Sequence, residues 1–296
     1  MNALEVRGLR KTYPAFTLKD VSFDVPQGAV VGFIGRNGAG KSTTLKSILG
    51  LVHPDGGHVR FFGQDVRQHE REFKEQIGVV LGGIDFYPKK KVKTITDVTR
   101  RFYRNWDETK YRHYLELFGI DESKRVDQLS SGMKVKYLLA LALSHNAKLL
   151  ILDEPTNGLD PSGIQQMRNL IKDMPNRCGA TVLISSHLLG EMEQMVDQVG
   201  IINHGRLLFQ GELDDLRKHS QGDISLRVLH PEKAAPILGN SARLERGVFH
   251  LPAMDEARLA ELIGRLAAAQ AGVVELNRAT KTLEEIFLSL TGVDAK

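Results

Sequence analysis

The stretch Gly35-Arg36-Asn37-Gly38-Ala39-Gly40-Lys41-Ser42 stands between a short apolar run, AVVGFI at 29–34, and a helical pattern at 41–49 that is closed by Gly50. Its spacing is G-x-x-x-x-G-K-[ST], in which glycines let the backbone curl so that several N–H groups face one anion. A strand before the loop and a helix after it are the context that a phosphate-binding loop needs, because the helix N-terminus adds its positive end. The stretch therefore predicts a site for the phosphates of a nucleotide.

The side chains of this loop predict separate contacts with the nucleotide. Lys41 should reach the β- and γ-phosphates, and the Ser42 hydroxyl should ligate Mg²⁺. The other positions expected to contact the phosphates are Gly35, Asn37, Gly38, Ala39, Gly40 and Thr43. A glycine-rich turn before a helix, with no ligand, is the alternative interpretation of the loop taken alone.

A second apolar run, LLIL at 149–152, ends in Asp153 and Glu154. In a doubly wound sheet, ligands bind at the carboxyl ends of the strands. Asp153 is then expected to hold Mg²⁺ through water, and Glu154 to orient and polarise the attacking water. A kinase or a small GTPase would not need this adjacent glutamate, so the pair favours an ATP hydrolase. A surface acid pair in a loop is the alternative.

The composition is that of a globular protein. The chain has 296 residues, of which 42% are hydrophobic and 26% charged, and one cysteine, which excludes a disulfide framework within the chain. The apolar runs are shorter than the roughly 20 residues of a spanning helix. The N-terminus, MNALEVRGLRKTY, has charges where a signal peptide needs an apolar run, so we expect a cytoplasmic protein. The net charge of +4 by itself indicates no nucleic-acid partner.

Strand and helix patterns alternate along the chain. Apolar strands are expected at 3–6, 17–19, 21–25, 29–34, 149–152 and 181–185, helices at 92–103, 108–118, from near 132 and at 162–174, and a hairpin at 200–210 turning at His204-Gly205. This order predicts an α/β P-loop NTPase fold with a mainly parallel sheet, an N-terminal antiparallel β subdomain and a helical subdomain at about 84–145. Strands at 224–229, 248–251 and 273–276 with helices at 255–270 and 283–290 predict a small C-terminal α+β extension. The expected domains are 1–216 and 221–296.

Four further motifs give the chain a resemblance to the ATP-binding subunits of ABC transporters over about residues 3–216. Leu129-Ser130-Ser131-Gly132-Met133 resembles the family signature, usually LSGGQ, and Asn157-Gly158-Leu159-Asp160-Pro161 resembles the D-loop. Ser185-Ser186-His187 is similar to the element that carries the switch histidine. Tyr13 lies where the family stacks an aromatic ring on adenine.

The resemblance implies ATP and Mg²⁺ as cofactors and two chains per active assembly. Ser130, Ser131, Gly132 and Met133 would bind the γ-phosphate of an ATP held by the opposite subunit, because they begin a helix. One chain carries one loop and one signature, so two chains, identical or different, would enclose two ATP molecules head to tail. Asp160 would hydrogen-bond across this dimer, and His187 would donate to the γ-phosphate or hold Glu154 and water.

The resemblance also implies a membrane partner. An ATPase of this kind drives a separate multi-span permease and lies peripherally on the cytoplasmic face of the membrane. Trp106-Asp107 and the ending LEEIF at 283–287 resemble ATPases of small two-gene and ABC-2-type exporters. The alternative is a soluble non-transport ABC ATPase of translation, DNA maintenance or cluster assembly. Translation-type members usually carry two ATPase halves, and DNA-type members carry long coiled coils, which this sequence does not suggest.

The sequence departs from the family pattern at two positions. Ser131 replaces the first glycine of the signature. Gly82-Gly83 follows IGVVL at 77–81, where the family carries a glutamine that touches Mg²⁺ and signals to the membrane partner, so water or Asp85 would have to substitute.

A basic window covers residues 89–104. It holds Lys89, Lys90, Lys91, Lys93, Arg100, Arg101 and Arg104 against only Asp97. Two interpretations stay open: a solvated helix face, or a docking surface near cytoplasmic loops and anionic lipid.

Overall fold

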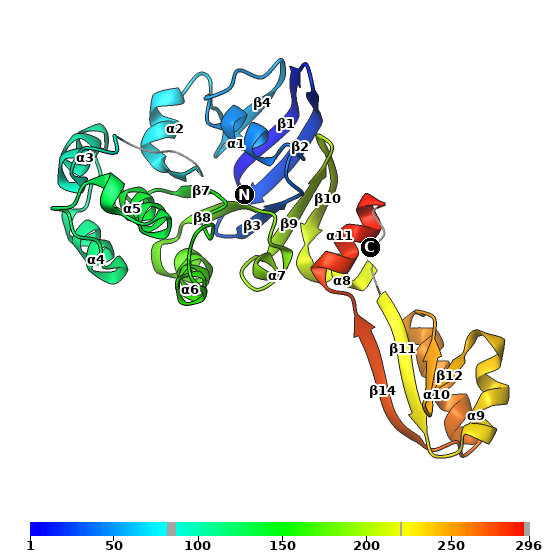
Figure 1. Ribbon diagram of the computed structural model, residues 1–296. Coiled ribbons are helices and arrows are strands. Elements are labelled where there is room, and N and C mark those ends of the chain that lie inside the picture. Colours follow the sequence, from blue (N-terminus) through cyan, green and yellow to red (C-terminus); the bar gives the residue numbers. More distant parts are fainter. Residues whose placement is uncertain (82–86, 220, 293–296) are drawn as a thin grey trace. The chain divides into compact units, whose positions relative to one another are not determined.

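The computed structural model describes residues 1–81, 87–219 and 221–292. The chain divides into two compact units, Met1–Leu213 and Asp214–Lys296 (Figure 1). Gly82-Gly83, which stands where the family carries a glutamine, and Asp85, which was expected to substitute for it, lie outside the described residues. The functional division of the chain at residues 216 and 221 stays a prediction. Among the described helices, none combines the length and the apolar character needed to cross a membrane.

The first unit is built on a mainly parallel sheet, as predicted. Its described strands are, in spatial order, β10 (Arg206–Glu212), β9 (Gln198–Asn203), β3 (Val30–Ile34), β8 (Thr181–Ser186), β7 (Leu149–Asp153) and β6 (Ile77–Val80). Only the β9–β10 hairpin is antiparallel within it. Strands β3, β7 and β8 are buried at every position, which is required of central strands covered on both faces.

Helices cover both faces of this sheet. In Figure 1, α1 (Lys41–Ile48) lies on one face, and α6 (Pro161–Cys178) and α7 (Leu189–Met192) lie on the other. Leu45 and Ile48 of α1 share a core with alternate residues of β3, whereas Gly32 of β3 faces Met192. Helix α6 begins and ends beyond the predicted 162–174, because Asp160 caps it and Pro175 lies inside it without ending it.

An antiparallel sheet precedes the parallel one. Strands β1 (Asn2–Tyr13), β2 (Phe16–Pro26), β4 (Gly56–Phe61) and β5 (Gln64–Asp65) pair in the order β2-β1-β4-β5. The two strands predicted at 17–19 and 21–25 are one strand. Asp20 adopts a left-handed backbone (φ 52) that shifts the register without ending the pairing. Helix α2 (Glu70–Gln76), which the sequence analysis missed, connects this sheet to β6.

A helical lobe holds the signature. It contains α3 (Val92–Thr99), the 3₁₀ turns Arg100–Phe102 and Val126–Gln128, α4 (Glu108–Phe118) and α5 (Ser131–Leu143). The predicted helix at 92–103 is therefore too long, since its last turn tightens and Tyr103 is extended. The buried Thr96 hydroxyl ties the lobe together through hydrogen bonds to the hydroxyls of Tyr111 (2.6 Å) and Tyr137 (2.9 Å).

The second unit has the α+β character that was predicted. After α8 (Leu213–His219), its elements are β11 (Gln221–Val228), α9 (Pro231–Leu238), β12 (Arg243–Glu245), β13 (Val248–Leu251), α10 (Glu256–Ala268), β14 (Val273–Thr280) and α11 (Leu283–Thr291). The antiparallel strand order β12-β13-β11-β14 is that of a split βαβ motif. Its core packs Ile224, Leu226 and Phe249 against Leu238 and Leu266 of the helices. Strand β12 was not predicted, because it is short and exposed at every position.

The β9–β10 hairpin turn braces the phosphate-binding loop. Gly205 donates its N–H to the Ala39 carbonyl (2.9 Å) and accepts a hydrogen bond from the Lys19 N–H (2.7 Å). Its backbone is left-handed (φ 75), and a Cβ there would lie 2.0 Å from the Thr17 carbonyl oxygen. Only glycine fits at this position without moving β2 or the loop.

We expect Gly205→Ala to lower the thermal unfolding midpoint much more than Gly28→Ala. Both glycines have φ 75, but a Cβ at Gly28 meets no atom within 4 Å. The shared backbone strain costs about 1 kcal/mol, and the overlap at Gly205 adds about 1–3 kcal/mol. Equal midpoints for the two variants would contradict the bracing role of the turn.

Candidate active site

The phosphate-binding loop places a buried ammonium group under its curled backbone. Gly40 has φ 113, and a Cβ there would lie 2.8 Å from the Phe16 ring, so glycine is required. Helix α1 begins at the next residue, Lys41, whose side chain is 6% exposed. Its Nζ donates to the carbonyls of Gly35 (2.7 Å) and Arg36 (3.4 Å). The lysine is therefore held across the loop, where it faces any group seated there.

The ends of two neighbouring strands supply the acids. The parallel register pairs Asp153 of β7 with Ser185 of β8, and the Ser185 hydroxyl donates to the buried Asp153 carboxylate. Glu154 follows with a left-handed backbone (φ 53), and its N–H donates to the Ser185 carbonyl (3.0 Å). Because of this turn, the two adjacent carboxylates have different surroundings. Asp153 is buried beside Ser185, whereas Glu154 lines the cleft described below.

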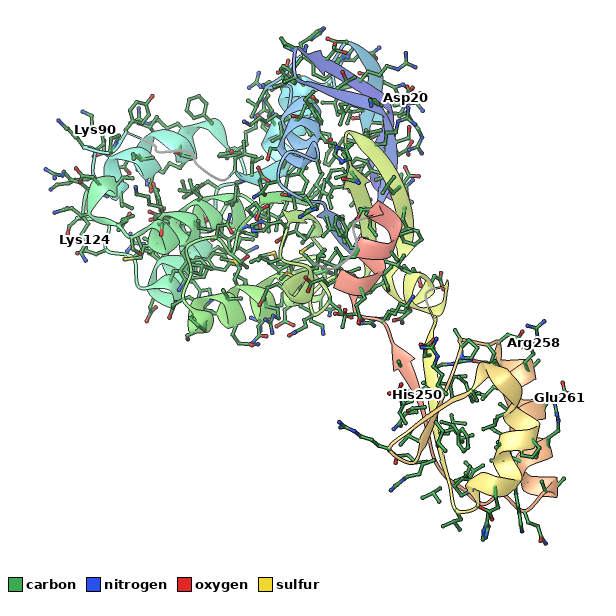
Figure 2. The ribbon with its side chains drawn as sticks, turned by 45° about the vertical axis from the view of Figure 1, so that its right-hand side comes forward. Asp20, Lys90, Lys124, His250, Arg258 and Glu261 are labelled. Atoms are coloured by element: carbon green, nitrogen blue, oxygen red, sulfur yellow. The ribbon has the colours of Figure 1, made fainter. Side chains whose placement is uncertain are left out.

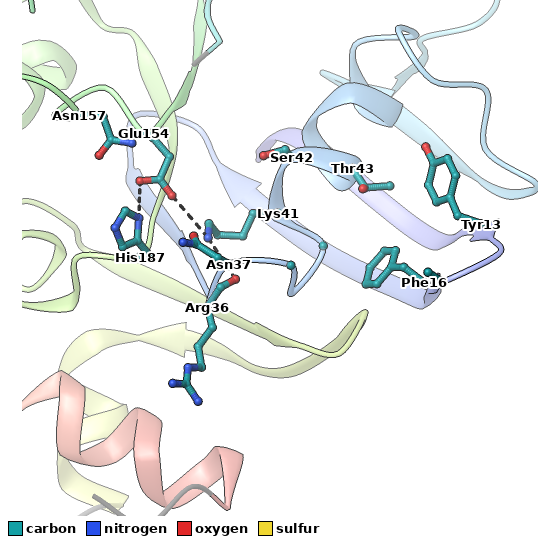
Figure 3. A pocket seen from close by; sticks show the side chains of 13 residues that line it. Tyr13, Phe16, Arg36, Asn37, Lys41, Ser42, Thr43, Glu154, Asn157 and His187 are labelled. Carbon is teal, nitrogen blue, oxygen red and sulfur yellow. Dashed lines mark hydrogen bonds and ion pairs between the residues drawn. The ribbon is translucent and has the colours of Figure 1, made fainter. Parts of the chain in front are cut away.

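Glu154 joins the lysine to the histidine. Its Oε2 lies 2.7 Å from His187 Nδ1, and its Oε1 lies 3.5 Å from Lys41 Nζ (Figure 3). The structure thus brings together three residues that the sequence analysis assigned to one site from three separate motifs. A cation, a carboxylate and an imidazole in this order can bind a phosphate and hold a water beside it.

These residues border an open cleft of about 680 Å³. It is lined by Tyr13, Ala15, Phe16, Arg36, Asn37, Gly38, Gly40, Lys41, Ser42, Thr43, Glu154, Asn157 and His187. Figure 3 shows Tyr13 and Phe16 at one end of the cleft and Glu154, Asn157 and His187 at the other. Gly35, Ala39 and Asp153, also predicted site residues, do not line the cleft and are buried. The lining residues that were not predicted as site residues are Ala15, Phe16, Arg36 and Asn157.

Tyr13 is held by a charged contact that the sequence analysis missed. The Asp55 carboxylate accepts hydrogen bonds from Lys11 Nζ (2.9 Å) and the Thr12 N–H (2.7 Å), and Lys11 Nζ lies 5.7 Å from the centre of the Tyr13 ring. The bond from Lys11, followed by that from the Thr12 N–H, holds the pKa of Asp55 below its usual value. Asp55 is far from Tyr13 in sequence, so no local pattern could have found it.

The signature contacts the D-loop, and of these two motifs only Asn157 lines the cleft. The Ser130 hydroxyl caps α5 by accepting from the Met133 N–H (3.2 Å), and the Ser131 hydroxyl donates to the Gly158 carbonyl (3.4 Å). Asp160 caps α6 by accepting from the Gly163 N–H (3.2 Å). Ser130–Met133 and Asp160 do not line the cleft described above. Within one chain, the structure therefore joins the predicted residues in two groups.

The oxygen donors near the loop fit a magnesium ion bound together with phosphates. Ser42 lines the cleft, and the buried Asp153 carboxylate stands at the end of β7, next in sequence to the cleft residue Glu154. No cluster of three or more histidine, cysteine or acidic side chains suited to a metal occurs in the described part of the chain. Magnesium needs no such cage, since it keeps several waters and takes one or two protein oxygens besides the phosphates.

Comparisons with known proteins match this arrangement. The family described as ABC transporter matches residues 18–157. The bacitracin transport ATP-binding protein BcrA of Bacillus licheniformis is 37% identical over 220 residues, covering 74% of this chain and 72% of that protein. The uncharacterized ABC transporter ATP-binding protein YhcH of Bacillus subtilis is 33% identical over 294 residues, with coverages of 98% and 96%. A solved structure of an ATP binding subunit of an ABC transporter has a TM-score of 0.67 at 31% identity and covers 74% of this chain and 93% of that one.

Proposed function

The chain belongs to the family of ABC transporter ATP-binding proteins and is an ATPase, and from this premise we propose that it powers export through a separate membrane permease. The proposed mechanism of ATP hydrolysis is supported above all by one observation: Glu154 lies between Lys41 and His187 at the cleft. A non-transport role finds no support, because the relatives carry transporter names. The exporter-like Trp106-Asp107 and the LEEIF ending support the direction of transport.

The triphosphate of ATP binds on the loop N–H groups, with Lys41 at its β- and γ-phosphates. Tyr13 stacks on the adenine at the other end of the cleft. Ser42 and, through water, Asp153 would hold Mg²⁺, whose charge would neutralise part of the charge on the phosphates. This arrangement is supported by the separation of the aromatic and acidic ends of the cleft in Figure 3.

Glu154 is the residue that orients and polarises the attacking water. A neutral His187 that donates its Nδ1 proton to Glu154 has no proton left on Nε2, so it cannot also donate to the γ-phosphate. Of the two roles expected for His187, this geometry supports the one in which the imidazole holds Glu154 in place.

Two chains complete the active sites. Ser130–Met133 begin α5, and the N-terminus of a helix attracts a γ-phosphate presented by another chain. A head-to-tail dimer would bring this surface, with Asp160 of the D-loop, to the cleft of the partner subunit. The dimer lies on the cytoplasmic face of the membrane, bound to the permease. Since the permease selects the cargo, we assign no substrate.

We expect Glu154→Gln to bind ATP but to lose turnover by about a hundredfold or more, because the amide cannot polarise water. The variant should accumulate as an ATP-bound dimer, measured by size-exclusion chromatography beside a phosphate-release assay. Glu116→Gln is the matched control, since Glu116 is exposed on α4 away from the cleft. Unchanged turnover in Glu154→Gln would remove the role given to Glu154.

Asp55→Asn should weaken ATP binding by about threefold to fivefold, because an amide loses the charge that holds Lys11 beside Tyr13. Affinity for inorganic tripolyphosphate, which has no base, should not change. Asp121→Asn is the control, since that carboxylate also accepts a backbone N–H and has a lowered pKa but lies in the helical lobe. If Asp55→Asn weakened the binding of ATP and of tripolyphosphate equally, Asp55 would support the phosphate-binding loop and not the Tyr13 ring that stacks on adenine.

A further inference from the structure

The far end of the helical lobe carries a rigid basic loop. Residues 87–93 run beside 121–126, with hydrogen bonds from the Val92 N–H to the Lys124 carbonyl (2.9 Å) and from the Val126 N–H to the Lys90 carbonyl (3.1 Å). Figure 2 shows Lys90 and Lys124 at this end of the lobe. We call Tyr87, Lys89, Lys90, Lys91 and Lys124 the basic tip.

Ion pairs neutralise part of the basic window but not the tip. Asp97 pairs with Arg100 (3.1 Å) and lies 3.8 Å from the Lys93 ammonium. Arg104 lies 3.5 Å from Glu75. By contrast, Lys89, Lys90 and Lys91 are exposed and make no ion pair with any residue that the structure describes. Arg101 is also exposed and makes no ion pair with a described residue, so three of the four unpaired cations of the window lie on this loop.

The described acids of the neighbouring segment 121–127 are already engaged. Asp121 accepts the Ser123 N–H, and hydrogen bonds from Ser123, followed by the charge of Lys124, lower its pKa. Glu122 accepts from the Tyr111 hydroxyl. Asp127 holds the Arg125 guanidinium through both oxygens (3.0 and 3.1 Å). Among the residues that the structure describes, these contacts leave Lys89, Lys90 and Lys91 as the unpaired cations of the tip.

We propose that the basic tip binds the anionic headgroups of the membrane surface. Lysine is a mobile, hydrated point charge that suits a diffuse anionic surface, whereas arginine suits fixed paired acceptors. Tyr87, with 71% of its side chain exposed, adds an amphipathic ring of the kind that sits at headgroup level. This inference rests on one element of the proposed function: a permease holds the protein, and with it the basic tip, next to a bilayer.

The full-length chain is mixed with vesicles of phosphatidylcholine, with or without about a third of phosphatidylglycerol, and bound protein is measured by sedimentation. We expect binding to the anionic vesicles alone, and a decline with added salt as the charges are screened. Replacing Lys89, Lys90 and Lys91 by glutamine should weaken binding by about fivefold per residue, on the order of a hundredfold together.

A control variant with glutamine at Lys19, Lys172 and Lys233 has the same net charge and also loses three exposed lysines. It should keep its vesicle binding, and both variants should keep wild-type ATP turnover, since none of these lysines lines the cleft. Equal loss in the two variants, or equal binding to neutral vesicles, would overturn the proposal. Binding to duplex DNA without binding to anionic vesicles would also overturn it. Absence of ATP turnover in the wild type would instead contradict the proposed function.

Discussion

The site depends on the register between β7 and β8. By pairing Asp153 with Ser185, it sets Glu154 and His187 at the same edge of the sheet, opposite the Lys41 ammonium. A lysine that is 6% exposed needs acceptors, because a buried charge without a partner is strongly destabilising. The Gly35 carbonyl and Glu154 supply them. The carboxylate that we propose to act on the attacking water therefore also offsets the cost of burying the Lys41 charge.

The contact between Ser131 and Gly158 links the two groups of site residues within one chain. Gly158 belongs to a chain of turns that starts at Glu154, whose carbonyl accepts the Asn157 N–H (3.1 Å). Space is tight at this contact, since a Cβ on Gly132 would lie 2.9 Å from the Gly158 carbonyl oxygen. A shift at the start of α5 must therefore displace the D-loop, and with it the backbone next to Glu154. The serine that departs from the family pattern adds a hydrogen bond to this link.

Site residues that stand in short sequence motifs could be predicted. Residues that support the site from distant parts of the sequence could not. Lys41, Glu154 and His187 stand in short patterns whose residue types state their chemistry, and parallel β strands bring such patterns to one edge. Asp55 and Phe16 stand in no such pattern, and each acts on a residue distant in sequence. Ser185 belongs to the motif of His187, but its hydrogen bond to Asp153 could not be predicted from that motif. Likewise, the strand break expected at Asp20 followed from local propensity, and pairing with β1 overrode it.

Charged side chains have different roles in the cleft and at the basic tip. In the cleft, the cation and the carboxylate constrain each other, and each is needed for the position of the other. At the basic tip, backbone hydrogen bonds of Val92 and Val126 hold the loop, so the lysine side chains are not needed to maintain its shape. Exposed lysine side chains that pair with no described residue keep their side-chain freedom. A partner that offers a broad anionic surface can engage them without breaking any intramolecular contact.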